Sequence, residues 1–584
     1  MLQSYDYVTM LVYLAFLLGV GWAFGRMSKT TSDFVRGGGK GTWWLVGSSS
    51  LLAGISAFTF SGNAAGAYDA GPTLLIIYLA NTLAFLVHAA FLASRFRQTR
   101  AFTAADVVRE RFGPAVEQFS AYYSVVIGAL TGAVPLWALA SFCSGVFAIP
   151  QDTLIVVLGT VVTLYAIKGG KWAVMGNDFV QSLIIYPITI LLAILALREV
   201  GGVSALIENF SRPDLAADFS FVKEPGQFPG DNFTWTWIIA AFITQFLAYV
   251  NLGSASRYLA ARDGREATRS ALLAAAGMGF GALVWFIPPW VTRMLWSADV
   301  EAMAALGEPA NSAYAIAALK LLPAGLVGVM VVAMFAATLS TMDVGLNGNA
   351  GTLIRNVIPP LRRVLGLSAL GDKQLMLAGK IGTLVMGALT IALALYFSKL
   401  KGFRLFDAFL QINSLIGMPL IMPMIAGLVV RRLPRWSFFW ILGMSAVPAV
   451  LSLFAATPWT YSERSLWVFA AGVAATLTAI PFYAREPADY RERVDGFFTK
   501  MNTPLNDEER GKSSDAMQAS ILGKASLAMA GALLFLLFIP NPAWGRYCIL
   551  AISGSVALVG GLLLLGARAE RRRLGANPEP TNAN

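Results

Sequence analysis

The sequence is poor in the residues on which most enzyme active sites are built. Its 584 residues include one histidine and two cysteines, and only 13% of them are charged. It contains no HExxH, CxxC or P-loop motif, which excludes the common zinc hydrolases, redox dithiols and phosphate-binding loops. Apolar residues make up 57% of the chain, against roughly 45–50% in soluble domains, and the mean hydropathy is +0.63. A soluble globular protein is therefore excluded.

Long apolar stretches follow one another along most of the chain. A bilayer core takes about 20 apolar residues per helix, and stretches of this kind recur with short interruptions. The sequence predicts an all-α, multi-pass membrane protein with about fifteen membrane-spanning helices. We expect them at residues 5–25, 43–70, 71–95, 116–149, 152–168, 171–198, 235–258, 268–297, 312–350, 374–399, 403–431, 436–456, 463–483, 523–540 and 545–567.

The formal net charge of +11 is concentrated in alternate loops. Basic loops of membrane proteins stay on the cytoplasmic side. We therefore expect a plasma (inner) membrane protein with its N-terminus outside and its C-terminus in the cytoplasm. Examples of the basic loops are 26–40, 95–111, 257–269 and 355–373. The group Lys399, Lys401 and Arg404 departs from the alternation.

Two of the expected helices are interrupted by small and polar residues. The second span carries such residues at 47–50 and 53–56, and the seventh carries them at 251–254. In hydrocarbon a broken helix persists only where it lines a cavity or a site, because unpaired backbone groups are costly there. Matching breaks five spans apart point to an inverted-repeat transporter with a site at mid-membrane. The alternative is that the small residues permit close helix packing.

The span at 312–350 carries hydroxyl groups on its second half. Thr338 and Thr341 are three residues apart, Ser340 lies beside them, and Met334 shares their stripe at helical spacing. Hard cations bind several oxygens at close range, and hydroxyls together with carbonyls freed by a helix break supply such ligands. The alternative is that each hydroxyl bonds to a carbonyl of its own helix.

Two carboxylates fall within the apolar spans. Asp178 lies seven residues past Lys171, about 10 Å into its helix, and Asp343 lies five residues past Thr338. Carboxylates inside a membrane are costly and mark ion or proton pathways. We expect Asp178 to meet a cation or a proton. For Asp343, lining the permeation path, titrating, and bonding to Asn347 one turn later are all open.

Four segments of the chain have the spacing of known signatures: 42–48, 102–113, 169–181 and 256–267. They resemble signatures of the sodium:solute symporter family, whose members include sodium-coupled glucose, proline and sialic acid carriers. They occur in the family's order, and the third has Asn177 where a threonine is usual. The resemblance extends from about residue 5 to residue 485.

The resemblance implies a LeuT-type fold, with ten core helices in two inverted repeats, one helix before them and a variable number after them. On this basis we expect residues 1–485 to form the sodium:solute symporter domain. The other expected units are core repeats at about 43–198 and 235–431, a cytoplasmic loop at 486–522, two additional membrane helices within 523–567 and a cytoplasmic tail at 568–584.

The resemblance also implies the ligands of a main sodium site. Carried over position by position, they are the carbonyls of Leu52, Ile55 and Met334 and the hydroxyl of Thr338. The second hydroxyl of that site falls on Ala337, which has none.

A second sodium site, found in some members of the family, has matching residues too. It corresponds to Asp178 with Ser340 and Thr341, aided by the carbonyl of Ala337. The resemblance therefore implies sodium as the coupling ion and leaves one or two ions per cycle open.

The organic solute is expected in the cavity that the two breaks line. No Arg or Lys lies in the central spans, and a buried monoanion needs a cationic or helix-end partner. A neutral sugar, a polyol or a zwitterion is therefore favoured. The candidate solute ligands are Ser56, Thr59, Asn63, Tyr78, Asn81 and Asn251, the last of which falls where sugar-carrying relatives have an asparagine.

These features predict a secondary active transporter, and not an enzyme, that moves a small polar organic solute together with sodium by alternating access. The expected partners are the solute, the sodium ion and the bilayer, with no nucleic acid, no further cofactor and a monomeric chain. Proton-coupled symport through Asp178 or Asp343 is the alternative. A membrane sensor is a more remote one, since no kinase or phosphoacceptor segment follows residue 485.

Overall fold

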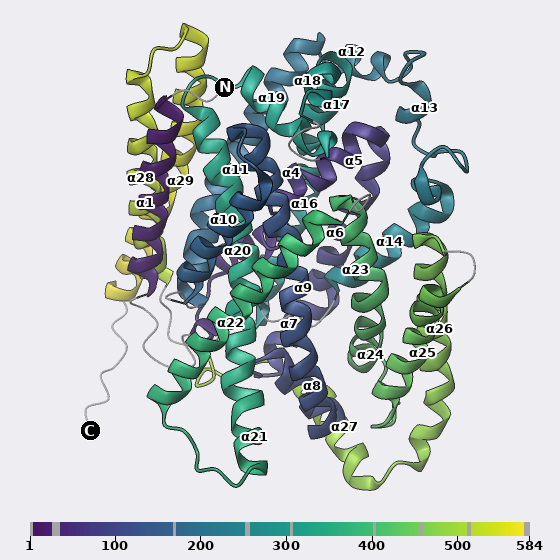
Figure 1. Cartoon of the computed structure of the whole chain (residues 1–584). Coiled ribbons are helices and arrows are strands. Elements are labelled where there is room, and N and C mark those ends of the chain that lie inside the picture. Colours follow the sequence, from purple (N-terminus) through teal and green to yellow (C-terminus); the bar gives the residue numbers. More distant parts are fainter. Residues whose placement is uncertain are drawn as a thin grey trace.

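The structure is a computed structural model that describes residues 4–25, 36–167, 171–250, 257–303, 308–400, 404–455, 459–510 and 515–576. All regular elements in these ranges are helices, and no strand occurs among them; a single isolated bridge joins Gly41 and Ala261. Figure 1 shows long helices running side by side between two ends formed by shorter helices and loops. The expected all-α fold is confirmed.

The helices have the following bounds. The first half of the chain contains α1 (Ser4–Gly25), α3 (Trp43–Leu52), α4 (Ala57–Phe60), α5 (Gly62–Ala70), α6 (Leu75–Val87), α7 (Ala93–Gln98), α8 (Ala104–Phe112), α9 (Pro114–Phe147), α10 (Gln151–Ala166), α11 (Lys171–Val200), α12 (Val203–Asn209), α13 (Ala216–Phe219), α14 (Trp235–Tyr249) and α16 (Gly264–Trp285). The second half contains α17 (Ile287–Leu295), α18 (Ser297–Glu301), α19 (Ala313–Leu321), α20 (Leu326–Thr352), α21 (Ile358–Val364), α22 (Asp372–Lys399), α23 (Leu405–Ile412), α24 (Met418–Val429), α25 (Ser437–Phe454), α26 (Tyr461–Ala479), α27 (Ala488–Asn502), α28 (Asp515–Leu534) and α29 (Ala543–Ala576).

The described ranges contain ten helical stretches that are long and apolar enough to cross a membrane. The expected number of about fifteen is therefore not confirmed. One reason is that consecutive helices run together, because a single stretch extends over 57–98. Another is that three further apolar helices, α10, α14 and the first part of α20, have only 10–17 residues.

The first expected break is present between α3 and α4. Residues 53–56 leave the helical path, and the Ser56 hydroxyl oxygen accepts the Phe58 N–H at 3.2 Å, which caps α4. Backbone groups at helix ends lack intrahelical partners, so carbonyls are exposed inside the bundle here. The second expected break, at 251–254, lies outside the described residues.

The expected span at 312–350 consists of two helices, α19 and α20, separated by a turn. Gly325 has φ +87° in this turn, a conformation that suits glycine. The Asp6 carboxylate of α1 accepts the N–H groups of Gly325 and Gly328 at 2.9 and 3.1 Å. Asn541, between α28 and α29, exchanges two hydrogen bonds with the Ala324 backbone. Helices from both ends of the chain thus hold the start of α20.

The two ends of the bundle differ in charge. Helices α8, α21 and α27 lie at one end, and α12, α13, α17, α18 and α19 lie at the other (Figure 1). The first of these, the basic end, carries the loops rich in Arg and Lys. The segment 102–113 builds α8 there, and its buried Arg111 donates to the Gly427 carbonyl at 2.9 Å and to the Tyr490 hydroxyl at 2.8 Å. The arginine of this signature is a structural anchor.

Candidate functional site

The hydroxyls of α20 lie against the break between α3 and α4. The Thr338 Oγ1 accepts the Ala57 N–H at 2.9 Å and donates to the Met334 carbonyl at 3.0 Å. The Thr341 Oγ1 lies 3.4 Å from the Ile55 carbonyl oxygen. Each hydroxyl therefore bonds to its own helix and also to the broken helix. The alternative, in which each hydroxyl bonds only to a carbonyl of its own helix, accounts for the first of these bonds and not for the second.

The other candidate ligands of the main sodium site are buried beside these hydroxyls. The Leu52 carbonyl accepts the Ile55 N–H at 3.2 Å within the break. The Ala337 carbonyl, a candidate ligand of the second site, accepts a hydrogen bond from Thr341 at 3.2 Å. The structure thus brings together oxygens of two helices and both predicted threonines, with Thr338 buried and Thr341 partly buried. An oxygen-rich, protein-enclosed position of this kind suits a small hard cation.

A second polar group is formed where Asp178 of α11 meets α3, one turn before the break. Its side chain is fully buried on α11, and the Ser49 hydroxyl donates to its Oδ2 at 2.5 Å. Ser340 and Arg257 are its other polar neighbours. Asp178 Oδ1 and Ser340 Oγ are buried and have no hydrogen-bond partner in the described part of the chain. A carboxylate oxygen and a hydroxyl oxygen are both possible ligands of a small hard cation.

Arg257 corrects the expectation that no Arg or Lys lies in the central spans. It falls within the expected span 235–258 and at the start of the basic segment 257–269, and the structure buries it in the core. There it donates to the carbonyls of Ser49 and Ser50 at the end of α3. A charged group fits at this depth because carbonyls and the Asp178 carboxylate surround it. The only sequence signal for this burial is its position in the segment 256–267.

A cavity of about 220 Å³ lies next to the break and contains the described solute candidates. The Asn63 Nδ2 donates to the Tyr78 hydroxyl at 3.0 Å. The Asn63 Oδ1 and the Asn81 Oδ1 have no partner among the described residues. Unpaired amide oxygens in a cavity are acceptors available to a ligand. Ser56, Thr59, Asn63, Tyr78 and Asn81 all line this cavity.

Sequence reasoning missed other residues of the cavity. Gln245 and Tyr249 line it from α14, Thr131 from α9 and Thr390 from α22. The signal that was available for Gln245 is an amide within a strongly apolar helix. No Arg, Lys, Asp or Glu occurs among the described lining residues. The cavity is therefore polar without being charged.

Two predicted site residues cannot be placed at the cavity. Asn251 lies outside the described residues. Asp343 belongs to α20, but its side chain lies outside the described part of the structure. The residues around it in α20, Met342 and Gly345, line the cavity, so the pathway role of Asp343 stays a prediction.

The cavity extends toward the basic end and is closed at the opposite end. Its lining includes Gly128 in the half of α9 nearer to α8, and Leu346 in the later half of α20. Toward the other end, the rings of Phe58 and Phe409 lie 4.7 Å apart at their centroids. The cavity therefore reaches into the half of the bundle that contains the basic end.

An ion-pair cluster fastens the closed end. Arg404, before α23, pairs with Asp69 at the end of α5 and with Glu308, which lies 3.3 Å from its Nε. Lys399 pairs with Asp152 at 3.6 Å. The described basic residues that departed from the alternation of loop charge thus have acidic partners, which explains why this end tolerates them.

Replacing Arg404 with glutamine is expected to open the closed end more often. The substitution removes the pair that joins the start of α23 to Asp69 of α5 and the pair that joins it to Glu308 before α19, so the population accessible from that end increases about three- to tenfold. The measurement is the labelling rate of Thr59→Cys by an impermeant thiol reagent applied from that side. Lys399→Gln, which removes an exposed pair at the same end, is the matched control and leaves the rate unchanged. Equal rates in all variants would contradict the closing role of Arg404.

Comparisons with known proteins agree with this geometry. The model of the sodium:solute symporter family matches residues 34–442. The chain is 24% identical over 488 residues to the sodium/sialic acid symporter NanT of Aliivibrio fischeri, covering 81% of this chain and 91% of that protein. It is 23% identical over 466 residues to the sodium/glucose cotransporter 1 of Mus musculus, covering 74% and 69%.

A solved structure shows the fold. It is a Na+-coupled sialic acid symporter in a substrate-bound, outward-open state, and it matches with a TM-score of 0.69 at 20% identity. The match covers 83% of this chain and 98% of that one. The LeuT-type architecture expected from the sequence is thereby confirmed.

Proposed function

The chain belongs to the sodium:solute symporter family, and we propose that it imports a small neutral polar solute together with sodium. The observation that carries this proposal is the contact between α20 and the break: Thr338 bonds to Ala57, and Thr341 lies at the Ile55 carbonyl. A cation bound among these oxygens joins the two helices. Sodium binding is thereby linked to the arrangement of the bundle.

A second sodium ion is proposed at Asp178. Its unpartnered Oδ1 and the unpartnered Ser340 hydroxyl support this assignment. Arg257 is the competing positive charge, because it acts on the same carboxylate. Its hydrogen bonds are made to carbonyls of α3, which leaves carboxylate oxygen for an ion. The Thr341 hydroxyl donates to the Ala337 carbonyl, and both groups are proposed as further ligands of this second ion, as the resemblance implies.

The proposed solute is a neutral sugar, a polyol or a zwitterion. Hydroxyl and amide groups line the cavity, with no charged side chain among its described lining residues. A buried carboxylate without a cationic partner pays a large desolvation cost. One relative is named for sialic acid and another for glucose; the neutral lining favours the second kind of chemistry. Asn251 remains a proposed solute ligand from the resemblance.

The proposed cycle is alternating access across a membrane. The chain is a multi-pass membrane protein, and we propose that its basic end faces the cytoplasm, with the N-terminus outside, and that it acts as a monomer. Sodium entering from outside stabilises the substrate-competent state, closure at Arg404 follows, and the cavity then opens to the basic end. Each charge that moves inward contributes about 2.3 kcal/mol per 100 mV of membrane potential.

The decisive experiment is uptake into proteoliposomes after a sodium jump. A thermal-shift screen of the purified protein against sugars, polyols, amino acids and nucleosides, with and without sodium, first identifies a solute, because a ligand of the native state raises the melting temperature. We expect an inward sodium gradient to accelerate uptake of that solute, and an inside-negative potential to accelerate it further. Uptake driven by an inward proton gradient without sodium would replace this proposal by proton coupling.

Replacing Tyr78 with phenylalanine is expected to raise the KM for the solute about fivefold, because the Asn63 amide loses its hydrogen-bond partner at the cavity wall. The half-saturating sodium concentration is expected to stay unchanged, because Tyr78 is not among the proposed sodium ligands. Tyr186→Phe is the matched control: its ring also packs on Trp285, at 5.9 Å between centroids, but it does not line the cavity. The measurement is initial uptake against solute concentration; an unchanged KM would remove Tyr78 from the solute site.

A further inference from the structure

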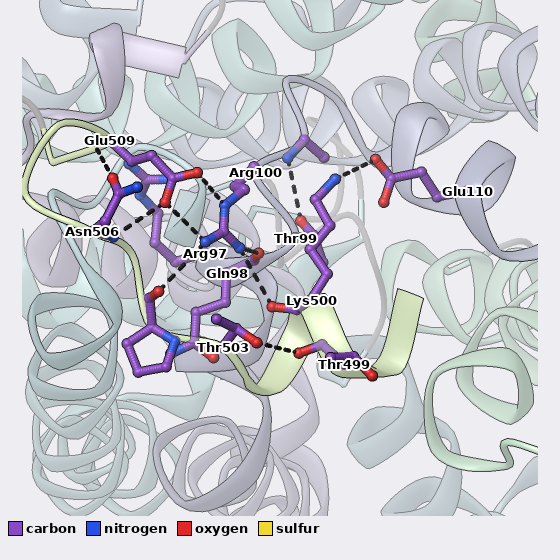
Figure 2. A network of polar contacts seen from close by, with 12 residues as sticks. Arg97, Gln98, Thr99, Arg100, Glu110, Thr499, Lys500, Thr503, Asn506 and Glu509 are labelled. Atoms are coloured by element: carbon purple, nitrogen blue, oxygen red, sulfur yellow. Dashed lines mark hydrogen bonds and ion pairs between the residues drawn. The ribbon is translucent and has the colours of Figure 1, made fainter. Parts of the chain in front are cut away.

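A charged network at the basic end fastens a late segment of the chain to the turn between α7 and α8 (Figure 2). The late segment consists of α27 and the turn that follows it, residues 488–510, and we call it the brace. It lies beyond residue 442, where the family match ends. The brace is therefore a feature of this chain that the family assignment does not explain.

The brace is anchored by a buried stripe and by ion pairs. On α27 the buried side chains are Tyr490, Val494, Phe497 and Met501, which recur at helical spacing. The Tyr490 hydroxyl accepts from Arg111 of α8 and donates to the Leu433 carbonyl at 3.1 Å. These contacts attach α27 to α8 and to the loop after α24, so the brace has a fixed position.

Arg100 connects the brace to the turn between α7 and α8. Its Nε and Nη2 donate to the two carboxylate oxygens of Glu509 at 2.6 and 2.9 Å, a bidentate pair of residues 409 positions apart. The same guanidinium donates to the carbonyls of Gln98, Lys500 and Pro504. Beside it, Lys500 pairs with Glu110 of α8 at 2.7 Å. Figure 2 shows these groups converging on Arg100.

The backbone at Arg100 is in an unfavourable conformation. Its φ is +60°, one of four positive values at non-glycine residues in the described ranges. A side chain with a Cβ disfavours this region, so contacts elsewhere have to hold it. The five hydrogen bonds of the guanidinium supply such contacts. Residues with an unfavourable backbone conformation that surrounding contacts hold in place are concentrated at functional sites.

The turn at Arg100 joins two arms that both line the cavity. Tyr78 and Asn81 lie on α6, which continues through a π-helical segment into α7. Gly128 and Thr131 lie on α9, which follows α8 directly. Both arms therefore contribute side chains or backbone to the wall of the cavity. No residue of the brace lines the cavity itself.

We propose that Arg100 is a positioning residue for transport, through which the brace holds the α6–α7 arm and the α8–α9 arm in the arrangement that opens the cavity to the basic end. This inference rests on the alternating access proposed above. The contacts are present in the arrangement that the structure shows, with the cavity reaching toward the basic end, so their removal lowers the population of that arrangement. Solute affinity within the cavity does not change, because the brace contributes no lining residue.

The pair is expected to persist across physiological pH. Arg100, followed by the backbone hydrogen bond from Asn506, lowers the pKa of Glu509 to about 2. A carboxylate with a lowered pKa stabilises the folded arrangement fully above its ordinary pKa, and this contribution is lost as the pH falls toward 2. Effects of Arg100 and Glu509 substitutions are therefore expected to be the same at pH 6 and at pH 8.

The test uses the full-length protein in nanodiscs, with both native cysteines removed by Cys143→Ala and Cys548→Ser, and Thr131→Cys as a reporter in the cavity. We expect Glu509→Gln and Arg100→Gln each to slow labelling of the reporter about three- to tenfold, as for loss of a bidentate pair at a partly exposed site. The charge exchange, Arg100→Glu with Glu509→Arg, restores the rate. Arg510→Gln, which removes a pair confined to the brace, leaves it unchanged.

Two results would overturn the proposal. One is an unchanged labelling rate in Glu509→Gln and Arg100→Gln. The other is a charge exchange that elutes as folded protein and still labels slowly, which would assign the residues a purely structural role. In parallel, uptake by Glu509→Gln is expected to show a lower maximal rate at an unchanged KM. Labelling of the reporter does not require transport. If the labelling rates changed as expected but the protein showed no sodium-driven uptake, the proposed function would be refuted and the positioning role of Arg100 would be retained.

Discussion

Replacing Thr338 with valine is expected to raise the half-saturating sodium concentration at least about tenfold and to slow sodium-driven uptake accordingly. Valine has the shape of threonine but lacks the hydroxyl, so the proposed ion loses a ligand oxygen, and loss of a group at a metal site costs about 10- to 100-fold in affinity. The substitution also leaves the buried Ala57 N–H without its acceptor, at about 1–3 kcal/mol. The measurement is initial uptake as a function of sodium at saturating solute.

Two controls separate the ion site from general stability. Thr338→Ser retains the hydroxyl and is expected to keep the half-saturating sodium concentration within about threefold of the unsubstituted protein. Thr383→Val removes another buried hydroxyl, which bonds within α22 to the Gly379 carbonyl at 3.0 Å, and leaves sodium dependence unchanged. If Thr338→Val folded normally and showed ordinary sodium dependence, the main sodium site would not lie between α20 and the break.

The second large effect is expected for Asp178→Asn. The asparagine keeps a hydrogen-bonding side chain of the same size but removes the charge that the proposed second ion requires. We expect the half-saturating sodium concentration to increase at least about tenfold and the Hill slope for sodium to fall from near two toward one. The melting temperature also decreases, because Arg257 stays buried without the carboxylate that faces it.

Asp152→Asn is the matched control for Asp178→Asn. It removes a carboxylate whose pair with Lys399 is exposed, and it is expected to leave the sodium dependence unaltered. A Hill slope that stays near two in Asp178→Asn would show that the second ion binds elsewhere. If the substitution abolished a pH dependence of uptake and left sodium dependence intact, Asp178 would be a proton carrier.

The agreement between sequence and structure is best where the signal is local. The run of apolar stretches predicted membrane helices, and the small polar residues at 53–56 predicted the break that ends α3. The spacing of Thr338 and Thr341 placed both on one side of α20, and both lie at the break. Each of these inferences depends on neighbours within one or two helical turns, which is the range over which helical periodicity acts.

The disagreements come from contacts between distant segments. Arg257 belongs to a basic segment by composition, but carbonyls of α3 and the charge of Asp178 make its burial possible. The expected number of spans is not confirmed, because helix breaks and continuous pairs of helices do not follow hydropathy alone. Arg404 departs from the alternation of loop charge, and the structure explains this by its ion pair with Asp69, which lies 335 positions earlier in the chain.

The amino-acid sequence by itself determined that this protein crosses a membrane many times, that a helix breaks at residues 53–56, and which family it resembles, because hydrophobicity, helical spacing and short motifs are properties of consecutive residues. Only the tertiary structure decided which polar groups share a site, which contacts cover the cavity at the end opposite the basic end, and that the brace binds Arg100 through Glu509. Those outcomes depend on how helices pack, and a charge or hydroxyl acquires its role from partners that the local pattern does not specify.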